Sequence, residues 1–220
     1  WSAKRAAPRS LSPDEAWAAE ITRRIVADCH PWQRDAVIDP SNQVSYLVGR
    51  GGAKTTSMRA RAIIKLINLS KQRIGYAAQS KEHARDLNWE KLKDVCEAYG
   101  IRSTVTSVVS KEPDVHLLDD KMRMTCLRTG SIYQLRGVED RRDADKFRGF
   151  PQAEMQADEA GSTSPSLLVY LLDSCVGPRL GEALALPPMD AEGNFLAPFS
   201  DDLRGGCVVV GSTPPEVLLG

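Results

Sequence analysis

The spacing of apolar residues along the chain switches repeatedly between the period of a helix and the period of a strand. Helical spacing predicts helices over residues 13–28, 54–69, 81–98 and 165–175. Alternating or β-branched runs predict strands over residues 43–48, 73–78, 121–127, 131–136 and 207–210, with a further short strand that ends at Ala157. The runs 121–127 and 131–136 also predict an antiparallel hairpin across Thr129-Gly130. This alternation predicts an α/β fold with a mostly parallel sheet and helices on both faces.

Three loops with unusual composition follow predicted strands, at residues 49–55, 158–161 and 211–215. In α/β sheets of this kind, ligands bind outside the carboxyl ends of the strands. We therefore expect these three loops to lie together and to form one ligand site.

The first of the three loops has the chemistry of a phosphate-binding loop. Its residues are Gly49, Arg50, Gly51, Gly52, Ala53, Lys54, Thr55 and Thr56. Glycine-rich backbone N–H groups and the N-terminal end of the following helix attract anions. Lys54 is placed to reach the β- and γ-phosphates of a nucleotide, and the Thr55 hydroxyl to ligate Mg²⁺. The segment departs from the pattern GxxxxGK[ST] at Val48 and Ala53, so an ordinary glycine-rich turn with a solvated lysine is the alternative.

The second loop begins with two acidic residues, Asp158 and Glu159. An aspartate at the end of a strand can bind Mg²⁺, and the next carboxylate can polarise the attacking water as a general base. A solvated acidic turn, with Ser162 or Ser164 capping the following helix, is the alternative interpretation.

The strand before the acidic pair is polar for a P-loop protein. Glu154 and Gln156 alternate with Met155 and Ala157. Because successive side chains of a strand point to opposite faces, we expect one face of this strand to be less buried than the other.

Four further segments occur in a definite order around these loops. They are Trp32-Gln33-Arg34-Asp35, Arg50 within the glycine-rich loop, the run 143–149 that contains Arg148, and Gly211-Ser212-Thr213-Pro214. In this order, residues 31–215 resemble the ATPase domain of the large terminase subunit of tailed bacteriophages, a P-loop NTPase of the RecA/ASCE-like type. Ala53 departs from the glycine usual in that family.

The resemblance implies roles for individual residues. Gln33 is expected to read the adenine edge, and Arg50 to lie near the γ-phosphate. Arg148 looks like an arginine finger that reaches into a neighbouring subunit, although a surface charge run is the alternative. Ser212 and Thr213 look like a coupling motif that links loss of the γ-phosphate to domain movement.

The resemblance also implies a function. It is ATP hydrolysis with Mg²⁺ that drives double-stranded viral DNA into a capsid. The implied partners are DNA, a homo-oligomeric ring (a pentamer in the family), the portal and the small terminase subunit, all in the host cell cytoplasm. A helicase-like or other P-loop ATPase, a nucleotide-binding module without turnover, and an α/β protein that binds another ligand remain as alternatives.

The expected organisation is an N-terminal arm and helix over residues 1–30, followed by an ATPase core over residues 31–220. Within the core, residues 177–206 are rich in Pro and Gly and are expected to form a long loop or insertion. The chain begins with Trp rather than Met, so we expect a fragment. The family's C-terminal nuclease domain is expected to be absent from it.

Composition narrows the function classes only slightly. The 29 basic and 29 acidic residues give a net charge of zero, so bulk charge does not argue for nucleic-acid binding. Local basic residues such as Lys81, Arg85, Arg141 and Arg142 are candidates for DNA contacts. The five cysteines are far apart and form no CxxC pair, which favours free thiols in a reducing compartment over a disulfide scaffold or zinc site. No apolar run approaches the roughly 20 residues of a membrane span. The N-terminal residues are basic and then polar, without the apolar core of a signal peptide, so none is expected.

Overall fold

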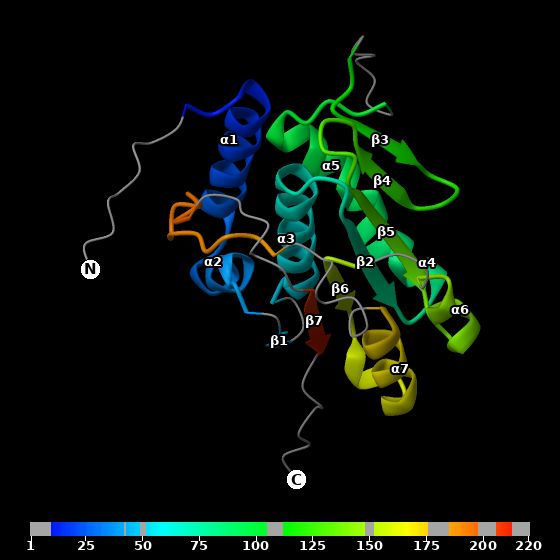
Figure 1. The fold of residues 1–220 in the computed structure, drawn as a ribbon. Helices are drawn as coiled ribbons and strands as arrows, with labels where there is room; N and C mark the ends of the chain where they lie inside the picture. The colour runs from blue at the N-terminus through cyan, green and yellow to red at the C-terminus, as the bar shows by residue number, and fades with distance from the viewer. Residues whose placement is uncertain are drawn as a thin grey trace.

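A computed structural model describes residues 10–41, 43–48, 52–104, 112–147, 152–175, 185–197 and 206–212 (Figure 1). The helices are α1 (Pro13–Asp28), α2 (Pro31–Ile38), α3 (Lys54–Asn68), α4 (Lys81–Ala84), α5 (Glu90–Tyr99), α6 (Arg141–Asp145) and α7 (Pro165–Cys175). The strands are β1 (Gln43–Leu47), β2 (Arg73–Ala78), β3 (Val115–Leu118), β4 (Arg123–Cys126), β5 (Ile132–Gly137), β6 (Glu154–Ala157) and β7 (Cys207–Ser212). A π-helical turn spans Arg85–Trp89, and a 3₁₀ turn spans Ala160–Ser162.

The strands of the described chain form one seven-stranded sheet in the order β1-β7-β6-β2-β5-β4-β3. The pairs from β1 to β5 are parallel, and the two pairs that join β5, β4 and β3 are antiparallel. This confirms the mostly parallel sheet and the hairpin of β4 with β5. The last of the described strands, β7, lies between β1 and β6, so the loops that follow these three strands leave from the same edge of the sheet.

Helices cover both faces of the sheet, as the sequence predicts. Helix α3 packs between one face and α1, and its apolar residues Ile63, Ile64, Leu66 and Ile67 are at most 2% exposed. On the opposite face, α6 and α7 pack on β6 and β2 around a second apolar cluster that includes Met155. Figure 1 shows α3 and α7 on different sides of β6 and β7.

The predicted helix over 81–98 is continuous but contains an irregular turn. Ser80 caps its start through a hydrogen bond that its hydroxyl accepts from the backbone N–H of His83, and Gly100 ends it in the left-handed conformation (φ +69°). Between α4 and α5 the π-helical turn buries Asn88 and Trp89. The Trp89 indole then donates to Asp119 at 2.7 Å, as a buried indole N–H requires a partner.

The expectation that β6 has a less buried face is wrong. Every residue of β6 is buried, and Glu154 and Gln156 are fully inaccessible. The Glu154 carboxylate lies 2.8 Å from Nε of Arg61 and 2.9 Å from Nζ of Lys65, both on α3 and both buried. Burial alone raises the pKa of the Glu154 carboxyl, but the charges of Lys65 and Arg61 outweigh burial and lower it to about 2. The polar residues of β6 therefore face a buried ion cluster rather than water.

The remaining features place no further constraint on the fold class. Within the described ranges, no helix is both long and apolar enough to cross a membrane. The cysteine side chains described at positions 29, 96, 126 and 207 are free thiols.

Candidate nucleotide site

The carboxyl ends of β1, β7 and β6 bring the predicted loops together. The backbone N–H of Val48, just after β1, donates to the carbonyl of Ser212 at the end of β7 (3.3 Å). Ser212 in turn accepts a hydrogen bond at Oγ from the backbone N–H of Gly161, in the turn after β6 (3.2 Å). The described ends of the three loops therefore meet at one place, as the order of the strands requires.

Lys54 and Glu159 meet at the centre of this site. Lys54 is the first residue of α3, is 8% exposed, and forms an ion pair with the Glu159 carboxylate. Glu159 itself adopts the left-handed conformation (φ +50°, ψ +41°), which is costly for a residue with a Cβ. Backbone outliers of this kind cluster at active sites and ligand-binding sites. The Lys54 ammonium thus lies at the positive end of α3, next to a carboxylate.

Thr55 and Asp158 form the second pair of the site. The Thr55 hydroxyl donates to Oδ2 of Asp158 at 2.6 Å, and the Tyr76 hydroxyl on β2 donates to the same oxygen at 2.8 Å. Asp158 is 2% exposed, and its Oδ1 accepts from the backbone N–H of Glu159 at 3.0 Å. Burial, followed by the charge of Asp158, raises the pKa of Tyr76 well above its ordinary value, so Tyr76 stays a hydrogen-bond donor. A hydroxyl beside a carboxylate is an oxygen pair that Mg²⁺ accepts as ligands.

Ala53 takes the backbone conformation that a glycine would adopt most easily. It caps the start of α3 with φ +58° and ψ +31°. This left-handed conformation costs a non-glycine residue about 1–2 kcal/mol. Its carbonyl accepts hydrogen bonds from the Gln33 side chain (3.3 Å) and from the backbone N–H of Ser57 (3.1 Å), which hold the turn in place. The departure from glycine is therefore accommodated by the backbone, at a cost in strain.

Gln33 lies beside the phosphate loop but its amide already has backbone partners. The side chain is 4% exposed, and Oε1 accepts from the backbone N–H of His30 at 3.0 Å while Nε2 donates to Ala53. Thr56 is exposed, and with Gln33 and Tyr99 it borders a small cavity of about 70 Å³. Gln33 thus ties α2 to the phosphate loop, and its contact with adenine stays a prediction.

Gly211 on β7 packs directly behind the site. A Cβ at this position would lie 2.5 Å from the Met58 methyl group and 3.4 Å from Oδ1 of Asp158. A larger residue at this position would have to displace the flexible end of Met58, so glycine lets β7 pack against α3 and β6 without that shift.

Several predicted site residues lie outside the described part of the chain. These are Gly49, Arg50, Gly51, Arg148 and Thr213. Gly52 is described and partly exposed. The geometry above neither supports nor opposes the predicted roles of the five residues outside the described part.

Tyr76 is a site residue that the sequence analysis missed. The apolar run of β2 carries it without any motif. Its relation to Asp158 depends on the pairing of β2 with β6, where Tyr76 lies opposite Gln156. The sequence offered one signal for this role: a tyrosine near the end of β2, the strand that pairs with β6.

Comparisons with known proteins agree with this geometry at the level of the fold. No family model and no curated protein sequence matches the chain. Among solved structures, the large terminase of phage HK97 superposes over 92% of this chain (TM-score 0.57, 14% identity), and that of a thermophilic bacteriophage over 87% (TM-score 0.55, 15% identity). The ATPase domain of the large terminase of Thermus phage P74-26 superposes over 87% (TM-score 0.50, 16% identity), and the match covers 68% of that chain.

The chain therefore has the α/β P-loop fold of large terminase ATPase domains, which confirms the predicted resemblance at the level of the fold. It spans 38% of the length of the HK97 terminase and of the thermophilic phage terminase. The thermophilic phage terminase has also been solved in complex with ADP and with ATP-γ-S.

Proposed function

We propose that this chain, with the fold of a large terminase ATPase domain, hydrolyses ATP with Mg²⁺ and uses the reaction to move double-stranded DNA. One observation carries the proposal. The start of α3, with Lys54 and Thr55, meets Asp158 and Glu159 at the shared edge of β1, β7 and β6. The nucleotide complexes of the thermophilic phage terminase support ATP as the ligand class.

The proposed roles follow from the chemistry of each side chain. The Lys54 ammonium neutralises phosphate charge at the positive end of α3. Thr55 and Asp158 would hold Mg²⁺, which would supply positive charge to stabilise the charge that develops on the phosphate oxygens. Glu159 accepts a proton from the attacking water.

The ion pair of Lys54 with Glu159 adds a further step to this proposal. An incoming phosphate competes with the Glu159 carboxylate for the Lys54 ammonium. Binding of the nucleotide then breaks the contact of Glu159 with Lys54, and the carboxylate can turn toward water. Hydrolysis before the phosphates are seated is thereby disfavoured.

The remaining assignments rest on the family resemblance. We propose that Gln33 contacts adenine, that Arg50 lies near the γ-phosphate and that Arg148 acts on a neighbouring subunit's site. Ser212 and Thr213 are proposed to couple phosphate loss to movement, and the hydrogen bond between Gly161 and Ser212 supports such a link for Ser212. The proposed partners are DNA, a homo-oligomeric ring, the portal and the small terminase subunit, in the host cell cytoplasm.

The assembly proposal is tested by the rate of ATP hydrolysis against protein concentration, with Mg²⁺. The wild type is expected to show activity that rises faster than linearly, because a ring completes each site with a neighbour's arginine. Arg148→Ala should lose about 10³-fold or more of that activity and keep ATP binding.

Arg142→Ala is the matched control, because it removes the same charge from a side chain that is 90% exposed. Activity linear in concentration and indifferent to Arg148 would reduce the proposal to a P-loop ATPase whose sites work alone. Tight ATP binding without hydrolysis at any concentration would instead favour a nucleotide-binding module.

A further inference from the structure

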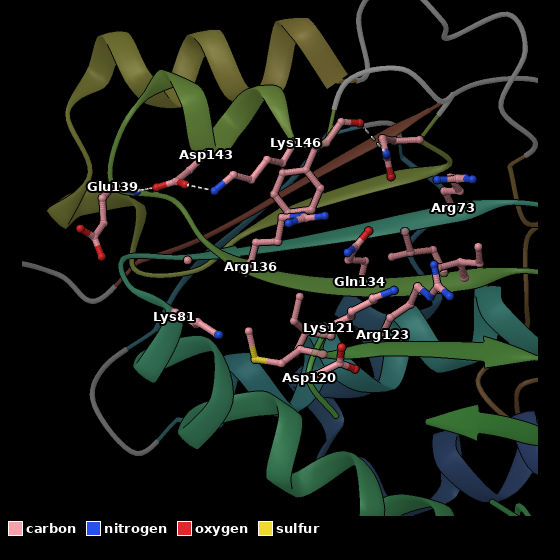
Figure 2. A pocket seen from close by; sticks show the side chains of 17 residues that line it. Arg73, Lys81, Asp120, Lys121, Arg123, Gln134, Arg136, Glu139, Asp143 and Lys146 are labelled. Carbon is pink, nitrogen blue, oxygen red and sulfur yellow. Dashed lines mark hydrogen bonds and ion pairs between the residues drawn. The ribbon is translucent and has the colours of Figure 1, made fainter. Parts of the chain in front are cut away.

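The face of the sheet that carries α6 and α7 is only partly covered by helices. The two helices pack on β6 and on the end of β2, through Phe147, Met155 and Leu171. In the described chain, no helix covers β4, β5 and the start of β2 on this face. A cavity of about 700 Å³ opens there, between these strands and α6 (Figure 2). We call this cavity the basic groove.

Strand alternation places polar side chains in the basic groove. On β5, Tyr133 and Leu135 are fully buried in the core shared with α3, so Gln134 and Arg136 project to the opposite face. On β4, Arg123 projects to the same face, and these three side chains line the groove. A sheet face that would normally be apolar and covered in an α/β fold is here open and cationic.

The lining of the basic groove has an excess of positive charge. The charged residues in it are six cations (Arg73, Lys81, Lys121, Arg123, Arg136 and Lys146) and three acids (Asp120, Glu139 and Asp143). Asp143 is engaged by Lys146 at 2.5 Å and by the backbone N–H of Glu139 at 3.2 Å. Figure 2 shows Glu139 and Asp143 at one end of the groove, while Arg73 and Arg123 lie at the other. The cationic end is thus remote from most of the acidic groups.

Two arginines in the groove hold buried donors that the described residues do not satisfy. Nε of Arg123 and Nε of Arg136 are buried and have no hydrogen-bond partner there. Burial lowers the pKa of Arg136, and burial together with the charge of Arg123 lowers the pKa of Arg73. Arginine remains protonated under these conditions, so both side chains keep their positive charge. The charge of Asp143 acts on Arg136, and the Arg136 guanidinium carbon lies 5.6 Å from the centre of the Phe147 ring. A buried unsatisfied donor is costly. An anion that enters the groove and draws these guanidinium groups toward it would supply the missing partner.

We infer that the basic groove binds the phosphodiester backbone of duplex DNA, with successive phosphates of one strand contacting Arg123 and Arg136. Guanidinium groups match phosphate geometry with two parallel donors, which favours phosphate over an uncharged ligand. The groove lies on β2, β5 and β4, away from the nucleotide site at the ends of β1, β7 and β6. That the bound polyanion is DNA rests on the proposed function. That an anion binds here is inferred from the residues that line the basic groove.

The test is fluorescence anisotropy of a labelled 30-base-pair duplex, titrated with the protein at several salt concentrations. The double variant Arg123→Gln/Arg136→Gln is compared with Arg23→Gln/Lys91→Gln. This control removes the same charge from exposed side chains of α1 and α5. Each phosphate contact contributes about 0.9 to the salt slope of log K, which is roughly eightfold in affinity at 0.1 M salt. We expect the groove variant to bind about 60-fold more weakly with a slope smaller by about 2, and the control to bind nearly as the wild type does.

A second variant, Lys81→Gln/Lys121→Gln, keeps the test informative should the arginine variant unfold. It changes lysines of the same groove and is expected to weaken DNA binding in the same direction. Equal affinity and salt slope in the wild type and the folded groove variants would overturn the inference. So would a loss of self-association in these variants with DNA binding intact, because the groove would then be a protein interface.

Two further measurements separate this inference from the proposed function and from small phosphates. ATP hydrolysis without DNA is expected to be the same in the wild type and the groove variants. If hydrolysis is found but DNA binding ignores the groove, the inference fails and the ATPase stands. If DNA binding depends on the groove but no hydrolysis is found, the inference stands and the ATPase fails. Tripolyphosphate that displaces DNA at equal phosphate concentration would overturn the backbone assignment in favour of a small-phosphate site.

Discussion

The Glu159→Gln variant is expected to lose ATP turnover by about 10²- to 10⁴-fold while it keeps ATP binding. The amide cannot accept a proton from the attacking water. It also no longer pairs as an anion with the Lys54 ammonium, so phosphate no longer competes with that carboxylate for Lys54. The dissociation constant for ATP should therefore be unchanged or lower in the variant. Steady-state phosphate release and equilibrium nucleotide binding, measured on the same protein, check both parts.

Glu192→Gln is the matched control for this variant. Glu192 is exposed and lies in the described part of residues 177–206, and its backbone N–H donates to Asp190. It should hydrolyse ATP at the wild-type rate. Wild-type turnover in Glu159→Gln would remove Glu159 as the general base and leave the acidic pair with a structural role.

Replacing Glu154 with Gln is expected to lower the free energy of unfolding by about 3–5 kcal/mol. The substitution removes the carboxylate that compensates two buried cations, Arg61 and Lys65, and leaves both charges buried without it. Gln156 loses a partner as well, because its amide donates to Glu154 at 2.6 Å. Urea denaturation of the variant, followed by circular dichroism, measures the loss.

The same carboxylate predicts how stability depends on pH. The folded pKa of Glu154 is lowered to about 2 from its ordinary value of 4.5, so its contribution is present above pH 4.5 and is lost as the pH falls toward 2. The wild type should therefore lose more stability between pH 5 and 3 than Glu154→Gln does. Glu97→Gln, on the exposed side of α5, should behave as the wild type at each pH. A Glu154→Gln protein with wild-type stability and wild-type pH dependence would show that the buried pairs are not formed.

Local patterns along the chain were sufficient to predict most of the elements and the centre of the site. Helix α3 begins at Lys54, as predicted, and its apolar stripe is buried. The pairs of Lys54 with Glu159 and of Thr55 with Asp158 join residues more than a hundred positions apart. They could be anticipated because a phosphate loop and a strand-end acidic pair both occupy the carboxyl edge of a parallel sheet.

The features that could not be predicted depend on contacts between distant segments. The polarity of β6 suggested a less buried face, because nothing in the sequence pairs Glu154 with Arg61 and Lys65 on α3. The short strand β3 was missed, since it is defined by its pairing with β4 rather than by a long alternating run. The basic groove could not be predicted because its cations come from separate segments that meet only when β4, β5 and β2 pair. The net charge of the chain is zero and gives no sign of such a local cluster.

The most direct test of the nucleotide site is the binding of a fluorescent ATP analogue with Mg²⁺ to the wild type and to Lys54→Ala. Loss of a charge-assisted contact to phosphate is expected to weaken binding by about ten- to a hundredfold. Lys91→Ala, which removes an exposed lysine of α5, should bind as the wild type does. A clear loss in Lys54→Ala alone would place the phosphates at the start of α3, where Asp158 and Glu159 converge. Equal dissociation constants in all three proteins would contradict the account, because the nucleotide would then bind elsewhere or not at all.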